Sequence, residues 1–333
     1  MKRMPMALAG FAACLALGAG ASDATNAAAS APVADHPPEG RISEWSVPTN
    51  LAPRDPAVDA RGVVFFAVSR GDRIARFDPR TERFTEWKLP EGTRPHGVVV
   101  ASDGKVFFGG YGNGTIGELD PATGAMRFHK SSDPASGVYA LAADRAGNIW
   151  CTERDIGRIG RLERATGTMT SHRMPGEPYA IVEDRQGRLW VSRIAADRLG
   201  ILDPRTGETA EIFTGAGSRP RRLALGPDGM LWVTYYGTGK VAMVDPARRL
   251  IAREFDLPGG ANVGPYAVAV DSAGRVWVGL FQTDSVTVLE PKTGKFTTFR
   301  VPGKMSGIRH AVLDQDGHYW YISTSLGKLG RIQ

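Results

Sequence analysis

The sequence predicts an all-β fold: a seven-bladed β-propeller with four antiparallel strands per blade, forming one domain over residues 41–333. Three observations support this prediction. One motif recurs about every 40 residues, each copy contains short runs that suit β-strands, and the two ends of the chain complement each other. No stretch shows a 3.6-residue apolar period, so helix is a minor component.

The repeat is anchored by an aromatic residue that follows a glycine turn. Successive anchors are separated by 42, 43, 40, 42, 45 and 43 residues, which is the range of a four-stranded propeller blade. The anchors are Phe65, Phe107, Trp150, Trp190, Trp232, Trp277 and Trp320. The sequence therefore contains seven copies of one structural unit.

Each copy contains four alternating or apolar runs separated by turn residues. In the fourth copy these runs cover residues 179–183, 188–192, 198–202 and 209–213. A recurring D/E-P-x-T-G segment separates the last two, and its proline fixes φ early in the turn while its glycine accepts a positive φ late in it. This pattern predicts antiparallel hairpins.

The ends of the chain predict how the ring closes. The seventh copy stops at Gln333 after its third strand, whereas residues 42–48 (ISEWSVP) match the fourth-strand segment 84–90 (FTEWKLP). We therefore expect the N-terminal strand to complete the last blade, which would cover sheet edges that otherwise aggregate.

The first 40 residues do not fit the repeat. Lys2 and Arg3 precede an apolar run over residues 4–17, and small residues then lead up to Ser22, so residues 1–21 are predicted to be a secretory signal peptide. A lipid anchor on Cys14 would need cleavage just before it, inside the apolar run. Residues 22–40 are Ala/Pro-rich and predicted to be a flexible linker. We therefore expect a periplasmic or secreted protein.

Composition limits the partners. The chain carries 41 basic and 35 acidic residues, a net charge of +6 that falls to +4 without Lys2 and Arg3. Without a run of Lys or Arg, this mild excess argues against nucleic-acid binding. We expect no membrane span and a monomer that binds a small molecule. Cys151 would be the sole cysteine after cleavage, which excludes an intrachain disulfide.

Propeller geometry predicts where a site would lie. The loop that enters the innermost strand and the loop after the second strand open on the same face, so two columns of residues should converge there. The first column, one residue before the small-aliphatic start of the innermost strand, is His96, Tyr139, Tyr179, Arg221, Tyr266 and His310. The first copy leaves Arg54 and Asp55 as alternatives. In the seventh copy either Arg309 or His310 could hold this position. We favour His310, which requires that the following turn be one residue shorter than in the other copies.

The second column lies three residues after each anchor. It contributes Glu153, Arg193 and Tyr235, with Arg154 and Tyr236 beside it. Aromatic faces and guanidinium groups suit an anionic or aromatic ligand, although access of water alone also makes propeller mouths polar. The residues predicted to bind the ligand are His96, Tyr139, Glu153, Tyr179, Arg193, Arg221, Tyr235, Tyr266 and Arg309. The chain has no P-loop, HExxH, CxxC or GxSxG motif.

Several motifs resemble the virginiamycin B lyase (streptogramin B lyase) family of seven-bladed propellers. P-[YH]-[AG]-[IV] occurs at 95–98, 178–181 and 265–268, WCTE at 150–153 is followed by RIGRL at 158–162, and the chain ends with KLGRI at 328–332. The resemblance covers roughly residues 41–333.

The resemblance implies a chemistry and a cofactor. The family confers antibiotic resistance by opening the lactone of streptogramin B antibiotics through elimination, with a His at the start of the last blade as general base and Mg²⁺ held by nearby acids. His310 matches that His. However, Ile308 and Thr324 stand where the acids are expected, and Tyr266 stands where a second His is expected. Mg²⁺ would thus lack its oxygen ligands, and the metal-binding residues are unknown.

Three functions follow as hypotheses. His310 could remove a proton α to a carbonyl without metal, with Arg309, Arg221 or Arg193 supplying positive charge and Tyr266 a hydrogen bond. Glu153 and His96 form another candidate acid–base pair. The alternative is a non-catalytic propeller that binds a small anionic or aromatic ligand or a partner protein. A metal-dependent lactonase ranks last, because only Glu153 and Asp55 offer carboxylates.

Overall fold

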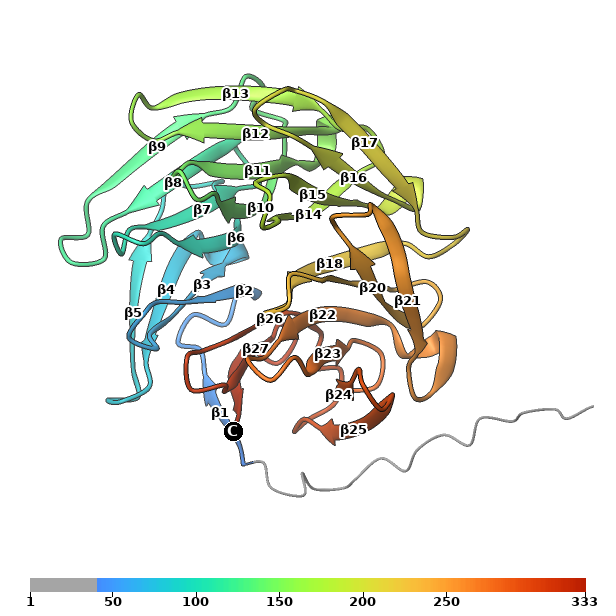
Figure 1. Cartoon of the computed structure of the whole chain (residues 1–333). Coiled ribbons are helices and arrows are strands. Elements are labelled where there is room, and N and C mark those ends of the chain that lie inside the picture. The colour runs from blue at the N-terminus through green and yellow to red at the C-terminus, as the bar shows by residue number, and fades with distance from the viewer. Residues whose placement is uncertain (1–40) are drawn as a thin grey trace, which may run out of the picture. The chain divides into compact units, whose positions relative to one another are not determined.

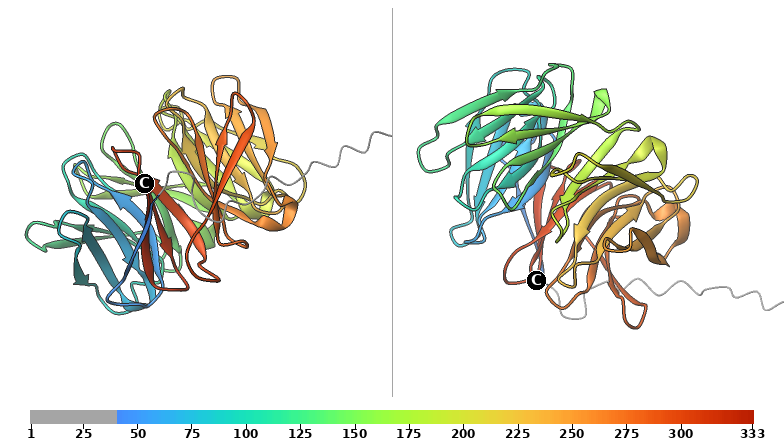
Figure 2. Two further views of the ribbon diagram at one scale, coloured as in Figure 1. Left: turned by 90° about the horizontal axis from the view of Figure 1, so that it is seen from below. Right: turned by 45° about the horizontal axis from the view of Figure 1, so that its top comes forward.

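A computed structural model describes residues 41–333, so the predicted signal peptide and linker lie outside the described residues. Seven sheets of four antiparallel strands surround a common axis, with the first strand of each sheet innermost (Figures 1 and 2). The predicted seven-bladed β-propeller is confirmed. No helix in this part of the chain is both long enough and apolar enough to cross a bilayer.

Each blade follows the chain from the axis outward. Blades one to three consist of β2 (Pro53–Val58), β3 (Val64–Val68), β4 (Arg73–Asp78), β5 (Arg83–Lys88); β6 (Pro95–Val100), β7 (Val106–Gly110), β8 (Thr115–Leu119), β9 (Met126–Lys130); β10 (Val138–Ala143), β11 (Ile149–Glu153), β12 (Arg158–Glu163) and β13 (Thr168–Arg173).

Blades four to six repeat this order. They consist of β14 (Pro178–Glu183), β15 (Leu189–Arg193), β16 (Arg198–Leu202), β17 (Thr209–Phe213); β18 (Pro220–Leu225), β19 (Leu231–Tyr235), β20 (Lys240–Asp245), β21 (Leu250–Asp256); β22 (Pro265–Val270), β23 (Val276–Leu280), β24 (Ser285–Glu290) and β25 (Lys295–Arg300). Short 3₁₀ turns are η1 (Ser69–Gly71), η2 (Arg154–Ile156), η3 (Ile194–Ala196) and η4 (Gly260–Val263).

The seventh blade joins the two ends of the described chain. Its strands are β26 (Ile308–Leu313), β27 (Tyr319–Ser323), β28 (Lys328–Ile332) and the N-terminal β1 (Ile42–Ser46). β1 pairs antiparallel with β28, from Ile42 opposite Ile332 to Ser46 opposite Lys328. The predicted closure by the N-terminal strand is confirmed, and the outer edge of β28 is covered.

A β-bulge shapes the innermost strand of every blade. In blade four, Pro178 pairs with Arg193 and Ile181 with Val191, so Tyr179 and Ala180 together face the single residue Ser192. The Ser192 hydroxyl accepts the Ala180 N–H at 3.0 Å and so occupies the donor that the bulge frees. Such a bulge re-aims side chains, and it allows consecutive residues of the first strand to face the channel at two depths.

The aromatic anchors fill the spaces between blades. Trp150, Trp190 and Trp320 are almost completely buried. Each indole N–H also donates to an aspartate six residues earlier, as in Trp190 to Asp184 at 2.8 Å, and the same aspartate accepts backbone N–H groups of its own turn. In these blades the tryptophan therefore fixes the turn at the end of the channel where the first strand finishes.

Candidate functional site

A pocket of about 220 Å³ lies at the end of the channel where the innermost strands begin. It is lined by Tyr139, Arg154, Tyr179, Arg221, Tyr236, Tyr266, Phe281 and Arg309. These side chains come from two positions in the blade, the second residue of the first strand and the residue directly after the second strand. Residues far apart in the sequence thus meet at one mouth.

The second column is shifted by one residue from its predicted position. Arg193 ends β15 and donates to Glu211 Oε2, on the outermost strand of the same blade, at 2.6 Å and to the Pro175 carbonyl at 2.5 Å. Glu153 ends β11 and accepts hydrogen bonds from the hydroxyls of Ser131 and Ser171.

Tyr235 ends β19 in the equivalent place and is buried. The prediction that Glu153, Arg193 and Tyr235 line the mouth is therefore wrong, because alternation along a strand directs its last side chain against the outer strands of the same blade. The next residues, Arg154 and Tyr236, face the pocket.

The seventh blade also differs from its predicted register. Ile308 pairs with Ser323 and Val312 with Trp320, the same offsets as in blade six, so the turn between these strands carries no deletion. Arg309 therefore occupies the column position of Tyr266, and the choice of His310 for that position is wrong. His310 lies one residue deeper, and in blade one Arg54 is the column residue and Asp55 the deeper one.

Three tyrosines from blades three, four and six meet at the pocket. The Tyr139 hydroxyl donates to that of Tyr179 at 2.5 Å, and the Tyr179 and Tyr266 hydroxyls are hydrogen-bonded in turn. His96 stacks on Tyr139 with ring centres 3.7 Å apart but does not line the pocket. The phenols thus form one hydrogen-bonded row across the mouth.

Arginines lie around this row of tyrosines, and their guanidinium groups pack against aromatic rings. The Arg221 guanidinium carbon lies 5.2 Å from the ring centre of Tyr179, 4.8 Å from that of Tyr236 and 5.1 Å from that of Tyr266. Arg309 lies 5.7 Å from the ring centre of Tyr266 and 4.9 Å from that of Phe281. These are cation–π distances.

The pocket arginines differ in their ionic partners. Arg154 pairs with Glu177, to which its Nε donates at 2.9 Å. Arg221 and Arg309 have no carboxylate partner among the described residues, and the buried Nε atom of each lacks a hydrogen-bond acceptor. Both residues line the pocket, so two guanidinium charges that no carboxylate neutralises face it.

The arginines also change the acidity of Tyr266. Burial would raise the pKa of its phenol, but Arg221, Arg222 and Arg309 outweigh burial, and the pKa of Tyr266 lies below its ordinary value. By contrast, burial raises the pKa of Tyr139. The hydrogen bond to Tyr179 also lowers the pKa of Tyr266, so this hydrogen bond and the arginines together favour the ionised phenol.

An ion pair closes the channel beneath the tyrosines. Arg222 of blade five reaches Asp55 of blade one, and its Nη2 donates to both carboxylate oxygens at 2.8 and 2.7 Å. Its Nε donates to the Arg309 carbonyl of blade seven at 3.2 Å. Burial alone would raise the pKa of Asp55, but Arg222 and His96 hold it well below its ordinary value.

Two histidines adjoin this pair. His96 Nδ1 lies 3.3 Å from Asp55 Oδ2, and burial lowers the pKa of His96 to about 4. His310 lines a separate small cavity of about 50 Å³ together with Asp55 and Arg222, and its Nδ1 has no hydrogen-bond partner. Burial, followed by the charge of Arg222, lowers the pKa of His310 to about 3. Both rings are neutral at pH 7.

The axial residues do not fit a divalent metal. Mg²⁺ needs several oxygen ligands, and among the residues lining the His310 cavity only Asp55 carries a carboxylate. Both oxygens of that carboxylate already accept from Arg222. The Arg222 guanidinium thus occupies the only carboxylate in the lining of this cavity that could bind a cation.

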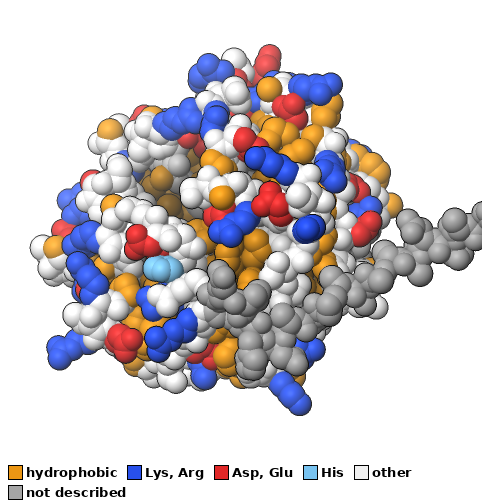
Figure 3. Space-filling model, turned by 60° about the horizontal axis from the view of Figure 1, so that its bottom comes forward, with side chains coloured by type: hydrophobic (Ala, Val, Ile, Leu, Met, Phe, Trp, Pro, Cys, Tyr) orange, Lys and Arg blue, Asp and Glu red, His pale blue; other side chains and the backbone are white. Residues whose placement is uncertain are grey.

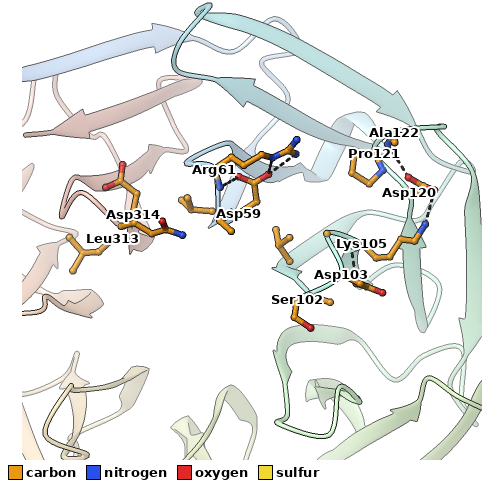
Figure 4. Close-up of a pocket in the computed structure, with 16 residues that line it drawn as sticks. Asp59, Arg61, Ser102, Asp103, Lys105, Asp120, Pro121, Ala122, Leu313 and Asp314 are labelled. Atoms are coloured by element: carbon orange, nitrogen blue, oxygen red, sulfur yellow. Dashed lines mark hydrogen bonds and ion pairs between the residues drawn. The ribbon is translucent and has the colours of Figure 1, made fainter.

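A larger cavity, of about 740 Å³, lies at the other end of the channel over blades seven, one and two (Figure 4). Its charged side chains are paired with one another or with turn backbone. Asp59 accepts from Arg61 and from its own turn, and Lys105 donates to Asp120 at 2.6 Å. This cavity therefore offers a ligand few free polar groups.

The surface shows no concentration of basic residues on the face seen in Figure 3. There, Lys and Arg side chains are interspersed with acidic and apolar ones.

Comparison with known proteins identifies the family. The family model described as the virginiamycin B lyase family matches residues 124–333. The chain belongs to this family. No curated protein sequence matches the chain.

Solved structures share the family fold at low sequence identity. A streptogramin B lyase structure is 21% identical with a TM-score of 0.82, over 88% of this chain and 97% of the other. Virginiamycin B lyase from Staphylococcus aureus is 20% identical with a TM-score of 0.82, over 89% of this chain and 99% of the other. A catalytically inactive His-to-Ala variant of that enzyme with quinupristin is 21% identical with a TM-score of 0.81, over 89% of this chain and 99% of the other. These likenesses establish the fold alone.

Proposed function

We propose that this protein binds a small anionic ligand in the pocket at the channel mouth. The observation that supports the proposal most is that Arg221 and Arg309 line the pocket and that neither has an anionic partner among residues 41–333. Among the arginines near the axis, Arg154 and Arg222 are neutralised by Glu177 and Asp55. An anion in the pocket would satisfy the remaining guanidinium groups.

Calorimetric titration of the purified protein with small carboxylates, phosphates and sulfates tests this proposal. Arg221→Met and Arg309→Met should each weaken binding at least about tenfold, since a hydrogen bond to a charged group contributes about 1.5–3 kcal/mol. Arg61→Met is the matched control, because Arg61 lies at the opposite end of the channel and pairs with Asp59. Binding that both pocket variants leave unchanged would contradict the proposal.

Elimination of a cyclic ester is the second candidate. Family membership supports it, as does the placement of His310 on the axis with its Nδ1 unpartnered. In this reaction His310 would take the proton α to a carbonyl, a carbon–carbon double bond would form, and the ester oxygen would leave as a carboxylate. Against it, His310 lies below the pocket, and its low pKa makes it a weak base.

Incubation with a streptogramin B, with and without EDTA, tests this second function. Elimination gives a linear product of unchanged mass and altered chromatographic retention, whereas hydrolysis would add one water. His310→Ala should abolish the new product. A substrate that remains cyclic under both conditions contradicts the function for this substrate class.

A further inference from the structure

The aromatic residues of the mouth already use their faces to hold arginines. Arg221 lies against Tyr179, Tyr236 and Tyr266, and Arg309 lies against Tyr266 and Phe281. A ring orients a guanidinium without neutralising its charge or occupying its N–H edge. These rings therefore orient two guanidinium groups whose charge no carboxylate of the described residues neutralises.

The row of tyrosine hydroxyls ends at the same place. Tyr139 donates its proton to Tyr179, and the hydrogen bond between Tyr179 and Tyr266 admits either hydroxyl as its donor. An anion beside Tyr266 favours the arrangement in which Tyr179 donates, because Tyr266 then keeps its proton for the anion. The ring centre of Tyr266 lies 5.1 and 5.7 Å from the guanidinium carbons of Arg221 and Arg309, so Tyr266 is the phenol of the row that lies beside both arginines.

Two positive charges face this pocket without a neutralising acid. Arg221 and Arg309 both line it, and neither has a carboxylate partner among the described residues. Two guanidinium charges without an acid partner match a ligand group that carries more than one negative charge better than a single carboxylate.

We infer that the recognised group is a doubly charged oxyanion of the phosphate-monoester class, bound by Arg221, Arg309 and the Tyr266 hydroxyl. This inference rests on the proposed function and narrows it, because an aromatic part of the ligand becomes unnecessary. Arg154 contributes less, since Glu177 already accepts its hydrogen bonds.

Calorimetry with inorganic phosphate, inorganic sulfate, phenyl phosphate and benzoate tests the inference. Phosphate, sulfate and phenyl phosphate should bind within a few-fold of one another, and at least about tenfold more tightly than benzoate, because two charge-assisted contacts replace one. Raising the salt concentration should weaken the dianions more than benzoate.

Variants then separate the inference from the proposed function. Tyr266→Phe should weaken phosphate about tenfold, Arg221→Lys should weaken it less than Arg221→Met, and Arg61→Met should change nothing. Thermal unfolding of each variant shows whether it has folded. If Arg221→Met does not fold, Arg221→Lys replaces it in the comparison. If benzoate binds as tightly as phosphate, or if Tyr266→Phe has no effect on phosphate, the inference fails and the anion pocket stands. If none of the four anions binds, both fail.

Discussion

The two ends of the channel are built from the same repeat, yet their charged side chains interact with different groups. At the end lined by Asp59, Lys105 and Asp120, acids cap their own turns and pair with neighbouring bases. At the mouth, Arg221 and Arg309 contact rings and have no acid partner. The larger cavity thus lies at the end where charged side chains are paired. The smaller pocket lies at the end where two arginines lack an acid partner.

This difference separates stability from function. A repeat requires its turns in every blade, so aspartates such as Asp184 stabilise the fold. Guanidinium groups that are desolvated without a counter-ion cost stability, and such costs are retained where they serve binding. Variants at the two ends should therefore have opposite consequences.

The largest effect should come from the ion pair between the two ends. Arg222→Ala leaves Asp55 as a buried, unpaired carboxylate, and removing one partner of such a pair costs about 3–5 kcal/mol. We expect the free energy of unfolding in urea to fall by that amount. The double variant Asp55→Ala/Arg222→Ala should be less destabilised than Arg222→Ala, and an equal or greater loss would contradict this reading.

Acid should destabilise the same layer. The pKa of His96 is lowered to about 4 and that of His310 to about 3, whereas an unfolded histidine titrates near 6.5. Between these values the unfolded chain binds more protons, so stability is fully present above about pH 6.5 and is lost as the pH falls. From pH 7 to pH 5 each histidine should cost on the order of 2 kcal/mol.

Urea titrations at pH 7 and pH 5 measure this loss. The variants His96→Asn and His310→Asn should each flatten the dependence of unfolding free energy on pH. A wild-type protein with equal stability at both pH values would show that these rings are not held neutral.

A turn aspartate should affect stability without affecting the pocket. Asp184 accepts from the Trp190 indole at 2.8 Å, from Arg188 Nε at 2.8 Å and from turn backbone. Asp184→Ala leaves these buried donors unpaired, at a cost of about 2–3 kcal/mol. Anion affinity measured by calorimetry below the unfolding temperature should stay at the wild-type value. A loss of affinity equal to that of Arg221→Met would mean that the two ends are coupled.

The sequence predicted the repeat well and the site in part. Periodic anchors and turns locate every blade, because these features recur in each copy. The structure places Tyr139, Tyr179, Arg221, Tyr266 and Arg309 at the mouth, each as the second residue of a first strand, whereas His96 has the same position in its blade and does not line the pocket.

The differences between the predicted and the observed site have local and long-range causes. The bulge lets consecutive residues face the channel at two depths, so a simple column could not separate Arg309 from His310. Alternation at the end of the second strand turned Glu153 and Arg193 away. The pairing of Arg222 with Asp55 joins residues 167 positions apart, and no spacing in the sequence encodes it.

The smallest effect should be that of divalent cations. With Arg222 bound to both oxygens of Asp55, and with Ile308 and Thr324 offering no carboxylate, the described residues that line the axial cavity leave no free carboxylate for Mg²⁺. Millimolar Mg²⁺ or EDTA should therefore shift the thermal unfolding midpoint by less than about 1 °C, since a ligand stabilises only by binding the folded state. A saturable upward shift with Mg²⁺ that Asp55→Asn abolishes would show that the cation displaces Arg222 from the carboxylate.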